Sequence, residues 1–245
     1  GGPRMSNTHA GCVLIHGSEL GAWLWGRMVA ELRSPALAVD LPGRGSRPAD
    51  RRSVRLEDAV RSVVDDVQKW DVDRVVLIAH SFSGVLVPAV AEALGERVGA
   101  VVLVGATVPL EGKSWVDLLP LPQRLLLRGL YKIRQAGLLS PEGENRKTLC
   151  NDLDAETTAW FLERRVPEAP HFLLDPVSTA TFPPEVPLHY VRLLSDRSVS
   201  DAVRERMIGA IPRLEVHDME AGHLPMLSQP AKLAGLLDGI AATPI

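Results

Sequence analysis

The sequence lacks the features that mark several specialised classes of protein. Its 245 residues include two cysteines, Cys12 and Cys150, which are too few for a framework of disulfide bridges and suit a reducing compartment. No His-x-x-His or paired-cysteine spacing is present, so we expect no metal site and no cofactor. The longest apolar stretch, residues 100–110, is much shorter than the roughly 20 residues that cross a bilayer.

An excess of charge of one sign is also missing. The chain has 27 basic and 30 acidic residues, which gives a net charge of −3. The largest basic cluster, Arg51 and Arg52 with Arg47 and Arg55 nearby, is too small to bind a nucleic acid or a membrane surface. We therefore expect neither partner.

The first residues show no pattern of a targeting signal. Residues 1–4, before Met5, are typical of the remnant of a cleaved tag, and no apolar signal segment follows Met5. We therefore expect a soluble cytoplasmic protein. Apolar residues make up 46% of the chain and charged residues 23%, which is ordinary for a globular protein. A chain of this length can form one large core, so we expect a single domain over residues 10–245.

The first half of the chain alternates strand patterns with helix patterns. Short apolar runs without polar alternation occupy residues 12–15, 36–40, 75–79 and 100–104. Such runs are typical of parallel strands that are covered on both faces. Between them, residues 56–70 carry an apolar stripe at helical spacing. The alternation predicts an α/β doubly wound sheet with right-handed crossovers.

The alternation stops in the middle of the chain and then resumes. Residues 109–187 hold ten of the nineteen prolines, with leucine-rich helical pieces between them. A connection this long between two strands is usually functional, and we interpret residues 109–183 as a helical lid. Strands are predicted again at 188–194 and 213–216, and a closing helix at 230–240.

Ser81 lies where the strand at 75–79 runs into a helix. A nucleophile at such a junction needs a sharp turn, so the residues two before and two after it must be small. Here they are Ala79 and Ser83, where the usual pattern has two glycines. The alternative is that Ser81 only caps the helix.

The loop after the first strand can supply an oxyanion hole. His16, Gly17 and Ser18 follow that strand, and we predict that the backbone N–H of Ser18, together with that of Phe82, binds an oxyanion. We interpret His16 as a residue that orients this loop.

A general base and its orienting carboxylate are predicted at the ends of the last two strands. His223 follows the final strand, at the sheet edge where ligands bind, and its imidazole can exchange a proton with Ser81. Asp196 follows the preceding strand and can hold the tautomer of His223. The rival carboxylates are Asp201, which looks like a helix N-cap, and two others, Asp218 and Asp175.

The order Ser81, Asp196, His223 on this framework resembles the α/β-hydrolase superfamily. Within it, the chain is similar to the small-lid branch that contains plant methylesterases, hydroxynitrile lyases and bacterial esterase-like relatives. The matching motifs are His-Gly at 16–17, Ala-Trp-Leu-Trp at 22–25, Asp-Leu-Pro-Gly-Arg-Gly at 40–45, His-Ser-Phe-Ser-Gly at 80–84, Ser-Asp at 195–196 and Gly-His-Leu-Pro-Met at 222–226. The resemblance implies six parallel strands, without the first two antiparallel strands of larger relatives.

The resemblance also implies hydrolysis of a small carboxylic ester. Hydroxynitrile lyases of this type have a Thr and a Lys where this chain has Gly17 and Leu224, which disfavours lyase chemistry. A serine nucleophile disfavours epoxide hydrolase and dehalogenase activity, since these need a carboxylate. Lactonase, thioesterase, C–C hydrolase and cyclase activities stay open, because fold analogy does not distinguish them. A ligand-binding protein without turnover is the alternative from another class.

The lid and the oxyanion loop are the expected sources of the substrate pocket. The candidate lining residues are Gly17, Trp115, Leu118, Leu119, Leu125 and Leu126. The leucines could instead pack the lid's own helices. The expected partner is a small ester-like molecule, and an exposed lid could support a homodimer.

Overall fold

The computed structural model describes residues 10–243, so the predicted tag remnant at 1–4 lies outside the described residues. A six-stranded, wholly parallel sheet has the order β2-β1-β3-β4-β5-β6. The strands are β1 (Gly11–Ile15), β2 (Ala36–Val39), β3 (Val75–His80), β4 (Val98–Val104), β5 (Leu188–Leu193) and β6 (Leu214–Met219). The predicted fold class is confirmed.

The continuous apolar runs of the central strands reflect burial on both faces. Every residue of β1, β3 and β4 is buried. Successive side chains point to opposite faces, so Val13 and Ile15 belong to one core and Cys12 and Leu14 to the other. Both Cys12 and Cys150 are free and buried. In the edge strand β6, by contrast, Met219 is the one buried residue.

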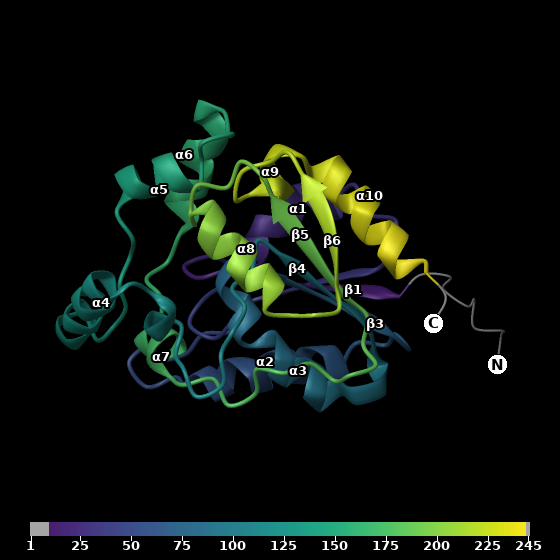
Figure 1. Cartoon of the computed structure of the whole chain (residues 1–245), viewed down its shortest axis with the longest axis horizontal. Coiled ribbons are helices and arrows are strands. Elements are labelled where there is room, and N and C mark those ends of the chain that lie inside the picture. Colours follow the sequence, from purple (N-terminus) through teal and green to yellow (C-terminus); the bar gives the residue numbers. More distant parts are fainter. Residues whose placement is uncertain (1–9, 244–245) are drawn as a thin grey trace.

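Helices cover the two faces of the sheet. Figure 1 shows α2 and α3 on one side and α1, α9 and α10 on the other. These covering helices are α1 (Gly26–Val29), α2 (Leu56–Gln68), α3 (Val87–Leu94), α9 (Pro225–Ser228) and α10 (Pro230–Ala241). Helix α8 (Asp201–Gly209) connects β5 to β6. Three short 3-10 helices are η1 (Ala22–Trp25), η2 (Ser81–Val85) and η3 (Gly95–Arg97). Across residues 10–243, no helix is both long and apolar enough to span a membrane.

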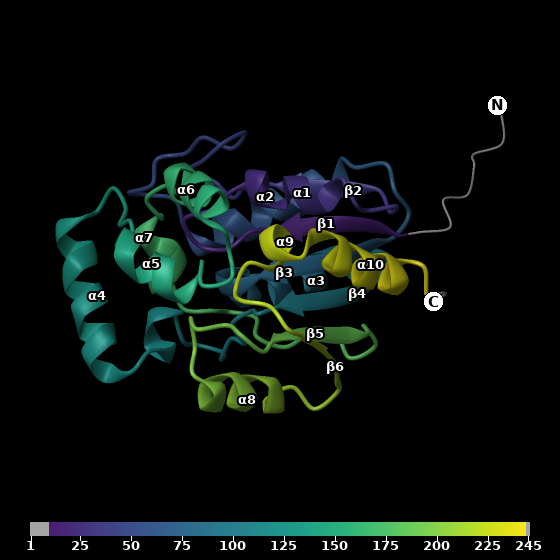
Figure 2. The same cartoon turned by 90° about the horizontal axis from the view of Figure 1, so that it is seen from above.

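The long segment between β4 and β5 is helical. It contains η4 (Val116–Leu118), α4 (Leu121–Ile133), α5 (Glu142–Thr148), α6 (Ala155–Arg164) and α7 (Pro170–Leu174). Figure 2 shows α4 to α7 gathered beyond the end of the sheet toward which β1 and β4 point. Ligands of parallel α/β sheets bind at this end, so the insertion lies where it can cover a site.

Candidate active site

The backbone at Ser81 is held in a conformation that few residues other than glycine adopt. Its φ is 55°, in the left-handed region, and this strain is common at functional sites. Ser81 is the first residue of η2, directly after β3. The Thr107 N–H donates to the Ser81 carbonyl at 2.9 Å, which fixes the turn.

The close approach behind this turn occurs at Gly84. A Cβ on Gly84 would lie 1.9 Å from the Thr107 carbonyl oxygen, so only glycine fits there. Ser83, which departs from the expected glycine, is fully buried, and its hydroxyl donates to the His16 carbonyl. The departure is therefore accommodated, since Ser83 links the turn to the loop after β1.

Ser81, His223 and Asp196 form a continuous hydrogen-bonded chain. Ser81 Oγ lies 3.0 Å from His223 Nε2, and His223 Nδ1 lies 2.7 Å from Asp196 Oδ2. Burial by itself would raise the pKa of Asp196, but the charge of His223 and hydrogen bonds from His223 and Ser198 lower it below its usual value. An ionised Asp196 accepts from Nδ1–H, which leaves Nε2 free to accept the Ser81 proton.

The last two strands bring the carboxylate and the imidazole together. Asp196 follows β5 and His223 follows β6, and the two strands are neighbours. Beyond their ends, the Ser195 N–H donates to the Ala221 carbonyl at 3.0 Å. Asp196 and His223 are both buried, whereas Ser81 is partly exposed. Solvent or a substrate can therefore reach the hydroxyl, while the other two groups are shielded.

The rival carboxylates lie elsewhere. Asp218 pairs with Arg192 at 2.6 Å. Asp201 has an 83% exposed side chain, and it is not the N-cap that we expected: Ser200 caps α8 by accepting from the Val203 N–H. Asp201 is therefore the first residue of helix α8 rather than its cap.

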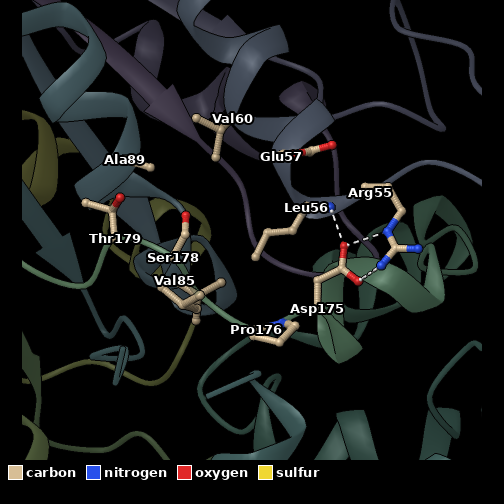
Figure 3. Close-up of a pocket in the computed structure, with 11 residues that line it drawn as sticks. Arg55, Leu56, Glu57, Val60, Val85, Ala89, Asp175, Pro176, Ser178 and Thr179 are labelled. Atoms are coloured by element: carbon tan, nitrogen blue, oxygen red, sulfur yellow. Dashed lines mark hydrogen bonds and ion pairs between the residues drawn. The ribbon is translucent and has the colours of Figure 1, made fainter. Parts of the chain in front are cut away.

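The third rival, Asp175, holds the end of the insertion against α2. Arg55 pairs with it at 2.6 Å, and the Leu56 N–H donates to it at 3.0 Å (Figure 3). These residues line a cavity of about 450 Å³. None of the residues lining this cavity belongs to the hydrogen-bonded chain of Ser81, His223 and Asp196. The contacts of Asp175 therefore attach the insertion to α2 and do not orient His223.

Ser198 is a site residue that the sequence reasoning missed. Its N–H and its hydroxyl donate to Asp196 Oδ1 at 2.8 and 2.6 Å, and its oxygen lies 3.1 Å from His223 Nδ1. Both carboxylate oxygens of Asp196 are thus occupied, which fixes its orientation. The Asp-x-Ser spacing, typical of a side-chain–backbone turn, was the signal that could have identified it.

Two buried histidines support the site without reaching the Ser81 proton. His16 accepts from the Leu41 N–H at 3.0 Å and donates from Nδ1 to the Gly17 carbonyl at 2.7 Å, as expected of a residue that orients the loop. His80 donates from Nε2 to the His223 carbonyl at 2.8 Å. Burial lowers the pKa of each to about 3, so both are neutral near pH 7.

The predicted oxyanion donors lie around Ser81. A Cβ on Gly17 would lie 3.0 Å from the Ser81 Cβ, so the loop after β1 passes next to the hydroxyl. The Ser18 N–H has no hydrogen-bond acceptor within residues 10–243. Phe82 is the second residue of η2, where backbone N–H groups lack a carbonyl of a preceding turn. Both groups are thus available to a ligand.

The insertion is bound to the loops on both sides of the site. The Glu19 N–H donates to Glu168 at 3.1 Å, and the Ser140 N–H donates to Glu19 at 2.7 Å. On the other side, Asp152 accepts from the Gly222 N–H at 2.8 Å. The insertion therefore fixes the loop after β1 and the loop after β6 together.

The leucines predicted to line a pocket are spread over the insertion. Trp115 packs on the main core, and Leu118 and Leu119 are half-buried. Leu125 and Leu126, on α4, are each 61% exposed. Contact of these residues with a substrate stays a prediction.

Comparison with known proteins places these observations in a family context. A family model described as "Alpha/beta hydrolase family" matches residues 12–236. The chain is 26% identical over 250 residues to "Putative methylesterase 11, chloroplastic" of Arabidopsis thaliana, covering 94% of this chain and 63% of that protein. It is 29% identical over 256 residues to "Probable esterase PIR7A" of Oryza sativa subsp. indica, covering 94% and 96%. The chain thus spans less than two thirds of the first relative.

Solved structures show the same arrangement of elements. An extracellular alpha/beta-hydrolase from a Paenibacillus species superposes with a TM-score of 0.83 at 22% identity, covering 95% of this chain and 99% of that chain. Polyneuridine aldehyde esterase superposes with a TM-score of 0.75 at 19% identity, covering 95% and 99%. At these identities the likeness is one of fold.

Proposed function

This chain belongs to the alpha/beta hydrolase family, and on that premise we propose that it is a serine hydrolase that cleaves small carboxylic esters. The observation that carries the proposal is the hydrogen-bonded chain of Ser81, His223 and Asp196, with distances of 3.0 and 2.7 Å. Ser81 lies in a strained turn and is partly exposed, which suits a nucleophile.

The proposed reaction has two halves. His223 Nε2 takes the Ser81 proton as the oxygen attacks the ester carbonyl, and the proton then passes to the leaving alcohol. Water attacks the resulting acyl-enzyme with His223 again as the base, which releases the acid and regenerates the Ser81 hydroxyl. Asp196 keeps the tautomer and stabilises the imidazolium that forms in each half.

The proposed oxyanion hole consists of the N–H groups of Ser18 and Phe82. Charge develops on the carbonyl oxygen as the tetrahedral intermediate forms, and preorganised N–H donors stabilise that charge. Support comes from the close approach of the Gly17 backbone to Ser81 and from the unpaired Ser18 N–H in the described part of the chain. Leu224, the residue after His223, is fully buried and apolar, which disfavours lyase chemistry that needs a cation there.

We propose that residues 109–183 form the lid of the site. The contacts of Glu168 with Glu19 and of Asp152 with Gly222 support this role, because they attach the insertion to both sides of Ser81. The candidate residues for an apolar substrate pocket under the lid are the partly buried Trp115, Leu118 and Leu119. We also propose a cytoplasmic location for the protein, which fractionation of cells that express it would test.

The exposed face of α4 supports a proposed homodimer. Leu121, Leu125 and Leu126 are each at least 58% exposed, and a second copy of this chain would cover them. Light scattering after size exclusion should give a dimer for the natural chain and a monomer after Leu125→Gln with Leu126→Gln. A natural chain that stays monomeric at high concentration would contradict this part of the proposal.

Labelling with a fluorophosphonate tests the nucleophile directly. We expect one adduct, which mass spectrometry should locate at Ser81, and no adduct in Ser81→Ala. The exposed Ser53 offers a matched control, since Ser53→Ala should label normally. An unlabelled Ser81 in the natural chain would instead favour a binding protein without turnover.

Turnover measurements identify the reaction and its substrate class. The relatives named methylesterase and esterase support a panel led by methyl and aryl esters of small acids, followed by lactones and thioesters. With the best substrate, Ser81→Ala should lower kcat on the order of 10⁴–10⁶-fold if the three residues act as a unit. Retention of more than a tenth of the activity would remove Ser81 from the nucleophile role.

A further inference from the structure

Two histidines and a glutamate gather on the outer strands of the sheet, outside the proposed catalytic site. His189 lies on β5, and Glu215 and His217 lie on β6. His189 pairs with Glu215 in the strand register. Residues two apart on a strand share a face, so Glu215 and His217 project to the same side as one another. The register thus brings three metal-ligating side chains together.

The distances among these side chains fit a single small cation. His189 Nδ1 lies 2.9 Å from His217 Nε2, and Glu215 oxygens lie 3.5 Å from His189 Nδ1 and 4.0 Å from His217 Nε2. Two ligand atoms about 2.05 Å from a zinc ion at a tetrahedral angle are about 3.3 Å apart. One ligand atom from each of the three residues lies within 4.8 Å of the other two, and the exposed Glu215 side chain can adjust to bring one of its oxygens to that spacing.

The surroundings favour a cation over the bare imidazole pair. Two facing imidazole nitrogens at 2.9 Å can share one proton, but they cannot both be charged without repulsion. Glu215 adds a carboxylate to the two imidazoles, and these are ligand types that zinc sites combine.

The cluster is also accessible. His189, Glu215 and His217 line a cavity of about 620 Å³, and within residues 10–243 its other lining residues include no lysine or arginine. Water or a small ligand in this cavity can complete the coordination of an ion held by three protein atoms. A site with three protein ligands and an open position is a common arrangement for zinc.

We propose that His189, Glu215 and His217 form a binding site for a divalent transition metal ion of the zinc class, which ties the edge strand β6 to β5. The sequence gives no sign of it, because the ligands come from two strands separated by a helix. The site is independent of the proposed esterase function, so either can fail without the other.

Zinc titration of the full chain tests the site. We expect one equivalent of Zn²⁺ to bind, by calorimetry in a buffer that does not chelate, and to raise the melting temperature. His217→Gln should weaken the affinity at least tenfold and abolish the rise in melting temperature. His171→Ala, which removes a histidine from α7, is the matched control and should bind as the natural chain does.

Two further measurements keep the result interpretable. Co²⁺ should give the visible absorption of a four-coordinate ion in the natural chain and lose it in His217→Gln, and His189→Ala supplies a second variant if the first does not fold. His223→Ala should retain binding. Absence of zinc binding at millimolar concentration, unchanged affinity in a folded His217→Gln, or loss of binding in His223→Ala would each overturn the proposal.

Discussion

The imidazole of His80 donates a hydrogen bond from Nε2 to the backbone carbonyl of His223, across 2.8 Å. The side chain that precedes Ser81 thus holds the main chain of the residue that accepts the Ser81 proton. The two rings lie 4.7 Å apart between centroids, and Trp25 packs edge-on against His80. His80 is therefore a positioning residue that connects β3 to the loop after β6.

Removal of this contact should impair turnover more than substrate binding. His80→Ala leaves a buried carbonyl unpaired, a loss of roughly 1–3 kcal/mol, and we expect kcat to fall about 10- to 100-fold with little change in KM. His80→Gln retains an N–H donor and should recover part of the loss. Steady-state kinetics of the two folded variants, at matched stability, make the comparison. An unchanged kcat in His80→Ala would contradict the positioning role.

Two substitutions separate the effect on kcat of the Asp196 carboxylate from the effect of its orientation. Asp196→Asn removes the acceptor of the Nδ1 proton, and kcat should fall about 10⁴-fold, the scale known for this change in Ser-His-Asp proteases. Ser198→Ala keeps the carboxylate and removes one hydroxyl donor to it, so a loss nearer tenfold is expected.

The pH profile of kcat distinguishes these two effects. Ser198→Ala should raise the pKa of Asp196, because a hydrogen bond to its charged form is lost, so the loss of kcat that accompanies protonation of Asp196 should begin at a higher pH. Ser195→Ala, whose hydroxyl contacts Glu220 instead, is the neighbouring control. Equal losses in Ser198→Ala and Ser195→Ala would exclude a specific role for Ser198.

The two buried neutral histidines should make stability fall in acid. Burial lowers the pKa of His16 and His80 from 6.5 to about 3. Between these values the unfolded chain binds protons that the folded chain does not, so the free energy of unfolding decreases as the pH falls below 6.5. Each histidine contributes a decrease of about 2 kcal/mol between pH 7 and pH 5 by the same relation.

Urea denaturation at the two pH values measures this contribution. His80→Gln should show a smaller decrease than the natural chain by about that amount, since glutamine does not titrate. The surface carboxylates contribute equally to the decrease in both proteins, so their contribution cancels when the two decreases are compared. Equal decreases in the free energy of unfolding for the two proteins would show that the fold does not keep His80 neutral.

Two glycine substitutions should have opposite effects on stability. Gly84→Ala places a Cβ 1.9 Å from the Thr107 carbonyl oxygen and should destabilise the fold by about 1–3 kcal/mol or more, the cost of overpacking. A Cβ on Gly129, within α4, would meet no neighbouring side chain within 4 Å, so Gly129→Ala should stabilise by roughly 0.5–1 kcal/mol. Thermal unfolding of both variants checks the pair, and a neutral Gly84→Ala would contradict the tight turn.

Local patterns were enough to predict the framework of the fold. The continuous apolar runs at β1, β3 and β4 report burial on both faces, and the stripe of α2 reports a single covered face. These are properties of neighbouring residues, so they can be detected without knowledge of the tertiary fold. The prediction failed at a boundary, where Ser200 rather than Asp201 caps α8, because helix ends depend on one or two residues.

The chain order of Ser81, Asp196 and His223 is likewise set by the sequence. Each residue follows a predicted strand, and parallel strands end at one edge of the sheet, so their convergence was foreseeable. The partners of these residues were not. Ser198 on Asp196, His80 on the His223 carbonyl and Ser83 on His16 depend on side-chain directions at the strand ends.

The sequence by itself determined the alternation of strands and helices, the position of the insertion and the order of the reactive groups. The tertiary structure alone decided how the insertion joins both sides of Ser81 and how His189 meets His217 on adjacent strands. The physical reason is that periodicity records which face of an element is buried, whereas contacts between distant segments follow from the register of the strands and the packing of the loops between them.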